Sequence, residues 1–80
     1  MEAARQREAN AGISEHRLRA ARRKELARLV SDWSRRSGDS HAVIHSRLRQ
    51  RAGGPEVAQA TVQQIDARIA LLREWFVGRV

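Results

Sequence analysis

The sequence predicts an all-α fold, a small three-helix bundle, from three observations. Ala, Arg, Leu, Gln and Glu, which favour helices, dominate the 80 residues. Apolar residues recur at intervals of three and four, and no segment alternates with a period of two over the length of a strand. The single Pro and most of the Gly residues stand where helices are expected to end. We expect a three-helix domain over residues 26–80, preceded by an extension or linker over residues 1–25.

The first helix is expected to pack through apolar residues that share one face: Leu18, Leu26, Leu29, Val30 and Trp33. Arg22 falls in the middle of this face, so the packed part is expected to begin near Glu25. Before it, Ser14 is a candidate cap and Gly12 interrupts the pattern, which leaves a helical extension and a frayed arm as alternatives. The helix is expected to end at Gly38, since glycine adopts the left-handed conformation of a C-cap at little cost.

A short second helix follows, with Asp39 or Ser40 as its N-cap. Its expected apolar face consists of Ile44, Leu48 and Ala52. Gly53, Gly54 and Pro55 must end it, because two glycines and a proline continue a helix only at high cost. Residues 56–60 are then expected to form an extended link, with Val57 packed against the core.

The third helix has the clearest start. Thr61 and Gln64 have the spacing of a capping box, in which each side chain bonds the backbone N–H of the other residue. An apolar stripe follows, formed by Val62, Ile65, Ile69, Leu72 and Phe76. Leu71 and Trp75 form a second apolar ridge about 90° around the helix. Such a helix either lies between two others or carries a partner site, so Leu71 and Trp75 are candidates for protein docking or a weak dimer.

The charge of the chain points to a polyanion as its partner. The net charge is +7, and Lys24 is the only basic residue that is not arginine. Residues 1–37 hold ten basic and five acidic side chains. Four cations lie on one side of the first helix, opposite its apolar face, and we call them the basic ridge: Arg17, Lys24, Arg28 and Arg35. The ridge could follow a nucleic-acid backbone, DNA or RNA, by contacting phosphates. The alternative is a solvated outer face, since Glu25 and Asp32 are near enough to pair with it.

The second helix offers further anion contacts at Arg47, Arg49 and Arg51. The short joint over residues 37–39 also permits a helix-turn-helix arrangement. In that case the base-facing positions would include Ser40, His41, Ala42, Ser46, Arg49 and Gln50. A plain packed hairpin has the same kind of turn, and both interpretations stay open.

No residue pattern indicates catalysis, a metal site or a cofactor. His41 and His45 have a chelating spacing but no third ligand, so a half-buried imidazole or a phosphate contact is favoured. Trp33 is expected in the core, with base stacking as the alternative. The chain has no Cys, no Tyr and no glycine-rich phosphate loop. It also has no apolar run of the ~20 residues that cross a bilayer and no signal peptide. We therefore expect a non-catalytic, cytoplasmic protein without membrane contact.

Several short runs of the chain are similar to a known family. The most specific are the residues Gly38, His41, Ile44 and His45, together with the Gly53–Pro55 triplet. With the runs 29–33 and 60–65 and Trp75, they resemble the C-terminal accessory domain of actinobacterial DEAD/DEAH-box ATP-dependent helicases over residues 26–77. The chain is more distantly similar to the C-terminal helical domains of phage antirepressors. The resemblance implies a role in nucleic-acid transactions beside a helicase motor domain in the same parent chain. The ATP-hydrolysing motifs of that motor are absent from these 80 residues.

Overall fold

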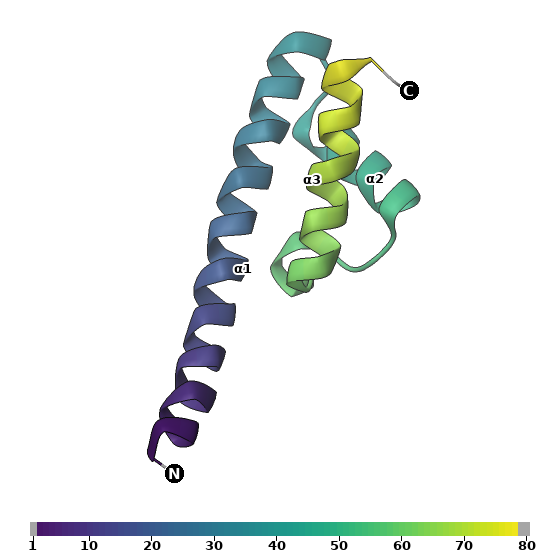
Figure 1. The fold of residues 1–80 in the computed structure, drawn as a ribbon. Helices are drawn as coiled ribbons and strands as arrows, with labels where there is room; N and C mark the ends of the chain where they lie inside the picture. The colour runs from purple at the N-terminus through teal and green to yellow at the C-terminus, as the bar shows by residue number, and fades with distance from the viewer. Residues whose placement is uncertain (1, 79–80) are drawn as a thin grey trace.

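The computed structural model describes the backbone of residues 2–78 and the side chains of residues 14–78. It contains three α-helices, α1 (Glu2–Ser37), α2 (His41–Ala52) and α3 (Val62–Val77), and one short 3-10 helix, η1 (Val57–Gln59) (Figure 1). There is no strand in residues 2–78, and the predicted all-α three-helix bundle is confirmed. The molecule measures 53 × 20 × 19 Å, and its long axis matches the length of α1 at about 1.5 Å per residue.

The long helix α1 has a packed half and a projecting half. Its backbone is helical from Glu2 onward, so Ser14 lies inside the helix and is not the N-cap that the sequence suggested. Leu26 and Val30 are its buried residues, and Leu29 and Trp33 are partly buried against the same core. Leu18 stays 41% exposed, because α1 continues past the end of α3 (Figure 1). The helix ends as expected, at Gly38 with φ +80°.

Helix α2 is held by a local cap and two core residues. Ser40, rather than Asp39, is the N-cap, and its Oγ accepts a hydrogen bond from the Val43 N–H (3.2 Å). Ile44 and Leu48 are fully buried, as the spacing predicted. The helix stops immediately before the two glycines and the proline.

The link between α2 and α3 is not wholly extended, contrary to the sequence-based expectation. Val57–Gln59 forms the single turn η1, in which the Ala60 N–H donates to the Val57 carbonyl (3.2 Å). Val57 packs against the core, as expected, and Ala60 is fully buried within it. Both contacts are made with distant parts of the chain, so periodicity within a five-residue link could not reveal the turn.

Helix α3 lies in contact with both α1 and α2. The predicted capping box is present: the Gln64 N–H donates to Thr61 Oγ1 (3.2 Å) and the Thr61 N–H donates to Gln64 Oε1 (2.9 Å). The buried apolar residues of α3 are Ile65, Ile69, Leu72 and Trp75. The wide apolar surface of this helix is thus explained by its position between two others.

Candidate functional site

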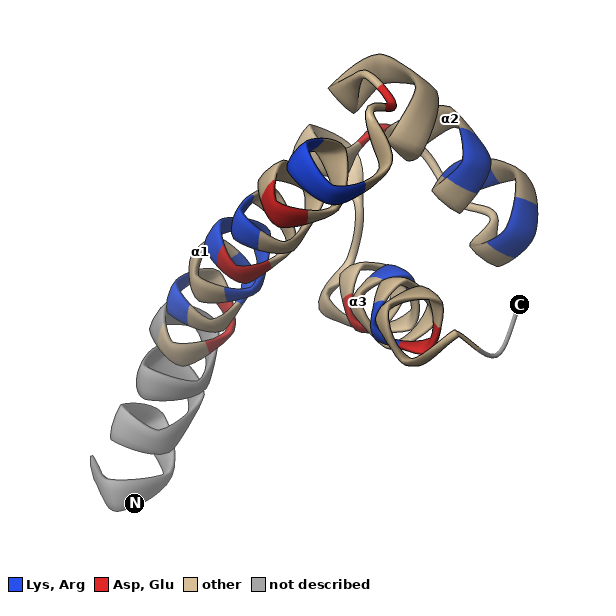
Figure 2. Ribbon diagram, turned by 90° about the horizontal axis from the view of Figure 1, so that it is seen from above, with Lys and Arg blue, Asp and Glu red and all other residues tan. Residues whose placement is uncertain are grey.

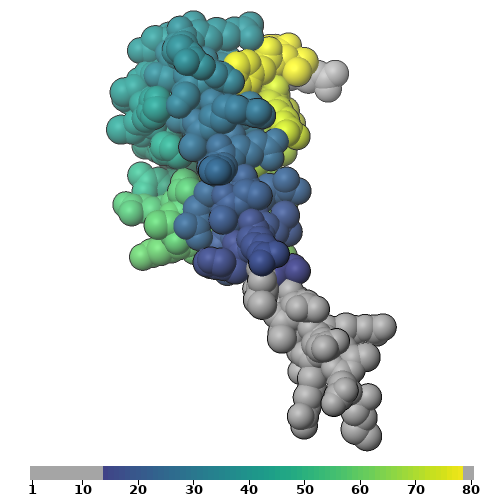
Figure 3. Space-filling view, turned by 90° about the vertical axis from the view of Figure 1, so that its left-hand side faces the viewer, coloured from purple at the N-terminus to yellow at the C-terminus, as the bar shows by residue number. Residues whose placement is uncertain are grey.

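The basic ridge lies on the outer face of α1. Arg17, Lys24 and Arg28 are all exposed, and none of them forms an ion pair with a carboxylate of residues 14–78. Figure 3 looks onto this side of α1, and neither α2 nor α3 covers it. Three cations therefore face solvent over about 17 Å of helix.

The fourth residue of the ridge differs from the other three. Arg35 is exposed, but its Nη2 pairs with Asp32 Oδ1 one turn earlier. A carboxylate in contact with a guanidinium competes with any external phosphate for the same donors. The open part of the ridge therefore runs from residue 17 to residue 28.

The carboxylates of the described region are used mainly to connect elements to one another. Glu25 of α1 pairs with Arg73 of α3, and Asp66 of α3 pairs with Arg22 of α1 (2.9 Å between Oδ1 and Nε). The remaining cross-links join Asp39 to Arg47 (2.8 Å) and Glu56 to Arg49 (3.8 Å). Figure 2 shows the resulting distribution, with most of the basic positions along α1 and on α2. Glu25 still borders Lys24 and Arg28, but the ion pairs that it forms are with Arg22 and Arg73.

The arginines of α2 do not form one cationic row. Arg47 and Arg51 line a pocket of about 570 Å³ that also includes Gln50 and the two tryptophans. Arg49 lines a different pocket, of about 410 Å³. Arg47 and Arg49 are already paired with carboxylates, whereas Arg51 forms no ion pair with residues 14–78. These residues therefore contribute less open charge than the ridge.

The aromatic residues form a cluster at one end of the bundle. Trp75 is 7% exposed, and its ring centroid lies 5.8 Å from that of Trp33. Phe76 meets Trp33 edge to face at 5.2 Å, and the Arg36 guanidinium lies 5.9 Å from the Trp33 ring centroid. Leu71 is partly buried against the same core. Trp75 is therefore a core side chain in this structure and is not displayed as an exposed docking anchor.

The proposed base-facing positions of α2 are partly open. His41, Ala42, Arg49 and Gln50 are exposed and Ser46 is half-buried. The Ser40 hydroxyl is already occupied by its capping bond.

Arg68 is the residue that sequence reasoning missed. It is fully buried, and its Nη2 donates to the carbonyls of Gly53 (3.1 Å) and Pro55. Gly54 has φ +87°, a conformation that favours glycine, and a Cβ there would also lie 3.1 Å from this Nη2. Both the backbone and the close contact therefore favour glycine at this position. The spacing Ile65, Arg68, Leu72 places the arginine on a buried face and could have identified it.

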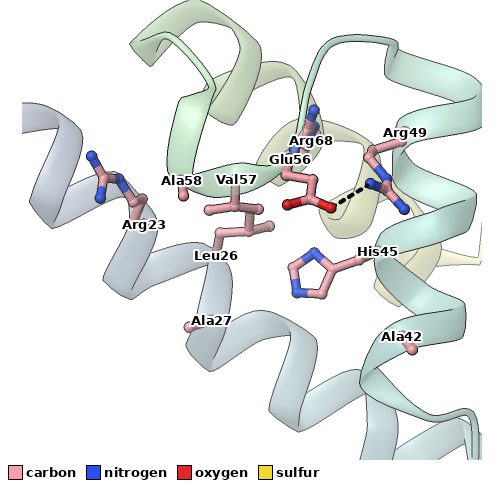
Figure 4. Close-up of a pocket in the computed structure, with 10 residues that line it drawn as sticks. All are labelled: Arg23, Leu26, Ala27, Ala42, His45, Arg49, Glu56, Val57, Ala58 and Arg68. Carbon is pink, nitrogen blue, oxygen red and sulfur yellow. Dashed lines mark ion pairs between the residues drawn. The ribbon is translucent and has the colours of Figure 1, made fainter.

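The 410 Å³ pocket lies between α1, α2, η1 and α3, and Arg68 lines it (Figure 4). Its other polar residues are Arg23, His45, Arg49 and Glu56; its apolar lining comes from Leu26, Ala27, Ala42, Val57 and Ala58. Burial lowers the pKa of His45 from its ordinary value, and the neighbouring charges of His41, Arg68 and Arg49 lower it further. Burial, followed by the charge of Arg49, also lowers the pKa of Arg68. The pocket thus disfavours additional positive charge.

The lowered pKa of His45 predicts a loss of stability in mild acid. In the unfolded chain His45 takes up a proton near its ordinary pKa of 6.5, whereas in the folded chain it does so only at lower pH. Below pH 6.5 the unfolded state therefore binds more protons, and the free energy of unfolding falls as the pH is lowered. Urea unfolding of wild type and His45→Gln at pH 7.5, 6.5 and 5.5 should show a smaller acid loss in the variant. His16→Gln, at an exposed position of α1, is the control, and equal losses in wild type and His45→Gln would contradict the prediction.

The described residues offer no evident metal site and no membrane-spanning element. Among residues 14–78, no three His, Cys, Asp or Glu side chains are grouped as a metal would require. No helix of the described chain combines the length and apolar character needed to cross a bilayer.

Comparison with known proteins finds mycobacterial relatives. An uncharacterized protein of Mycobacterium tuberculosis strain CDC 1551 / Oshkosh is 52% identical over 52 residues. Uncharacterized proteins of M. tuberculosis strain H37Rv and of Mycobacterium leprae strain TN are 50% and 46% identical over the same length. Each match covers 65% of this chain and only 9% of the relative. No family model and no solved structure matches the chain.

Proposed function

We propose that this chain is a non-catalytic nucleic-acid-binding module that contacts phosphates through the open part of the basic ridge. The observation that supports this proposal is that three exposed cations of α1 form no ion pair within the described region. Arg17, Lys24 and Arg28 face solvent without carboxylate partners among residues 14–78, while the carboxylates cross-link the bundle elsewhere.

The arrangement suits backbone contact better than base reading. A row of cations along a helix can neutralise successive phosphates, and each contact releases a counterion. The α2 arginines that could read base edges are divided between two pockets, and two of them are already paired. We therefore expect slight sequence selectivity and micromolar affinity.

The module is proposed to belong to a larger protein. The chain spans 9% of the length of its curated relatives, and the family resemblance of residues 26–77 suggests a helicase as the parent. Any motor activity, and any preference between DNA and RNA, would then belong to the whole protein.

The ridge can be tested by fluorescence anisotropy with labelled single- and double-stranded oligonucleotides at 50 and 200 mM salt. With about three phosphate contacts, the wild-type affinity for a duplex should fall roughly 40-fold over this range. Arg17→Gln/Arg28→Gln should weaken binding at least about tenfold at 50 mM salt and lower the slope of log affinity against log salt by about 2. Both positions are exposed, so stability should change by less than about 0.5 kcal/mol.

Two matched variants make this experiment specific. Arg47→Gln/Arg51→Gln removes the same charge from α2 and should weaken binding less than the ridge variant. Arg35→Gln should have a small effect, because Asp32 already occupies that guanidinium. If the ridge and α2 double variants weaken binding equally, net charge alone explains the affinity, and the assignment to the ridge is wrong.

A further inference from the structure

The pocket between α1, α2, η1 and α3 contains a charge that the fold does not balance. Arg68 is fully buried and forms no ion pair with any carboxylate of residues 14–78. Its Nη2 is satisfied by two carbonyls, but its Nε and Nη1 have no hydrogen-bond partner among residues 14–78. Buried charges are normally paired, and buried donors are normally bonded.

The surroundings of Arg68 add positive charge. Arg49 of α2 lines the same pocket and is close enough to lower the pKa of Arg68. Arg23 lines the pocket from α1, and His45 stands between α1 and α2 (Figure 4). Among the described residues, Glu56 is the one carboxylate of the lining, and its 79% exposed side chain pairs with Arg49 at 3.8 Å. This pair is long and solvated, so an external anion can replace it.

We propose that this pocket binds a phosphate monoester or inorganic phosphate, with Arg68 and Arg49 as its main ligands and Glu56 as the internal anion that it displaces. The volume of about 410 Å³ exceeds that of a phosphate group, and the apolar lining leaves room for the organic part of a monoester. Guanidinium groups are the usual partners of phosphate oxygens. Arg17, Lys24 and Arg28 do not line the pocket, so the proposal for the pocket and the proposal for the ridge can be contradicted independently.

Phosphate bound at this site should raise the pKa of His45 relative to the free protein. A bound anion adds negative charge beside His45 and favours its protonated form, which can donate a further hydrogen bond. The charged groups around His45 that must be considered are His41 and Arg49 of α2, Arg68 of α3, Arg23 of α1 and Glu56.

The test is an NMR titration of the intact chain with inorganic phosphate at constant ionic strength, with chloride as the replaced anion. We expect saturable shifts of the Arg68 Nε–H and His45 ring signals, with a Kd of about 1 mM. Arg49→Gln should weaken binding at least about tenfold. Glu56→Gln should strengthen it about threefold, because the competing carboxylate is gone.

The control for charge is Glu74→Gln, which removes the same charge from an exposed position outside the pocket and should leave phosphate affinity unchanged. Equal effects of Glu56→Gln and Glu74→Gln, or identical shifts with phosphate and chloride, would overturn the proposal.

Arg17→Gln/Arg28→Gln should retain phosphate binding even if it no longer binds nucleic acid. Titrations with a nucleoside monophosphate, and with oligonucleotides that carry a 5′-phosphate or a 5′-hydroxyl, identify which phosphate the pocket takes. If it takes a free phosphate ligand, inorganic phosphate, the nucleoside monophosphate and the 5′-phosphorylated oligonucleotide all bind. If it takes the end of a nucleic acid, binding requires the 5′-phosphorylated oligonucleotide.

Discussion

Replacement of Arg68 by Ala should destabilise the domain by about 3 kcal/mol. The substitution removes the donor for the Gly53 and Pro55 carbonyls and leaves a gap where the guanidinium and its alkyl stem were buried. Loss of a hydrogen bond to a charged group costs about 1.5–3 kcal/mol, and the cavity left by the side chain adds to this cost. The free energy of unfolding, measured by urea denaturation followed by circular dichroism, provides the check.

Arg68→Met separates the contribution of the guanidinium hydrogen bonds from that of the buried alkyl stem. Methionine keeps an unbranched apolar stem but cannot donate to the turn, so its cost should be smaller, about 1–2 kcal/mol. A Met variant as stable as the wild type would show that Arg68 does not stabilise the turn between α2 and α3. Gly54→Ala perturbs the same contact from the opposite side and should cost more than Gly38→Ala, where φ is also positive but a Cβ would meet nothing within 4 Å.

The sequence predicted those features of the fold that depend on neighbouring residues. The capping box of Thr61 and Gln64 acts within one helical turn, and the end of α1 at Gly38 needs only one left-handed residue. The apolar spacing of Ile44 and Leu48 likewise identified a core face without any knowledge of the partner helices. Such signals are complete within about ten residues.

Features that depend on how the helices meet could not be predicted in the same way. A helical wheel shows that Trp75 lies beside the main apolar stripe, but only the position of α3 between α1 and α2 decides that both ridges are covered. Helical spacing could place Arg68 on the buried face, but it could not show its hydrogen bonds to the turn at Gly53–Pro55, which lies 13–15 residues earlier in the chain.

The basic ridge illustrates both situations. Helical spacing alone places Arg17, Lys24, Arg28 and Arg35 on one face. Which of these cations has no ion-pair partner depends on the cations that the carboxylates contact in the folded chain. Glu25 could pair with ridge residues along α1, but it contacts Arg73 of α3 instead, whereas Asp32 does pair with Arg35. Whether a carboxylate pairs with the ridge or with another helix is therefore decided by helix packing and not by spacing along α1.

Trp75→Ala should have the largest effect on stability, about 3–5 kcal/mol, because it removes a buried indole from the aromatic cluster. An 80-residue domain is expected to have about 4–12 kcal/mol in total, so this variant should lose a large fraction of its stability. Trp75→Phe should cost much less, about 1 kcal/mol, since it keeps an aromatic ring and removes an indole N–H that has no hydrogen-bond partner in the described part of the chain. Thermal and urea unfolding, followed by circular dichroism, measure the stability of the wild type and of both variants.

The same variants distinguish a core tryptophan from a docking anchor. If Trp75 acts in the core, Trp75→Ala lowers the unfolding temperature at every protein concentration, and Leu71→Ala, which truncates a half-buried side chain, lowers it less. If Trp75 instead anchored a dimer, Trp75→Ala would remain folded, and light scattering would show the mass falling from two chains to one. A folded Trp75→Ala monomer with wild-type stability would therefore contradict the core assignment and favour a protein-docking role for this end of the bundle.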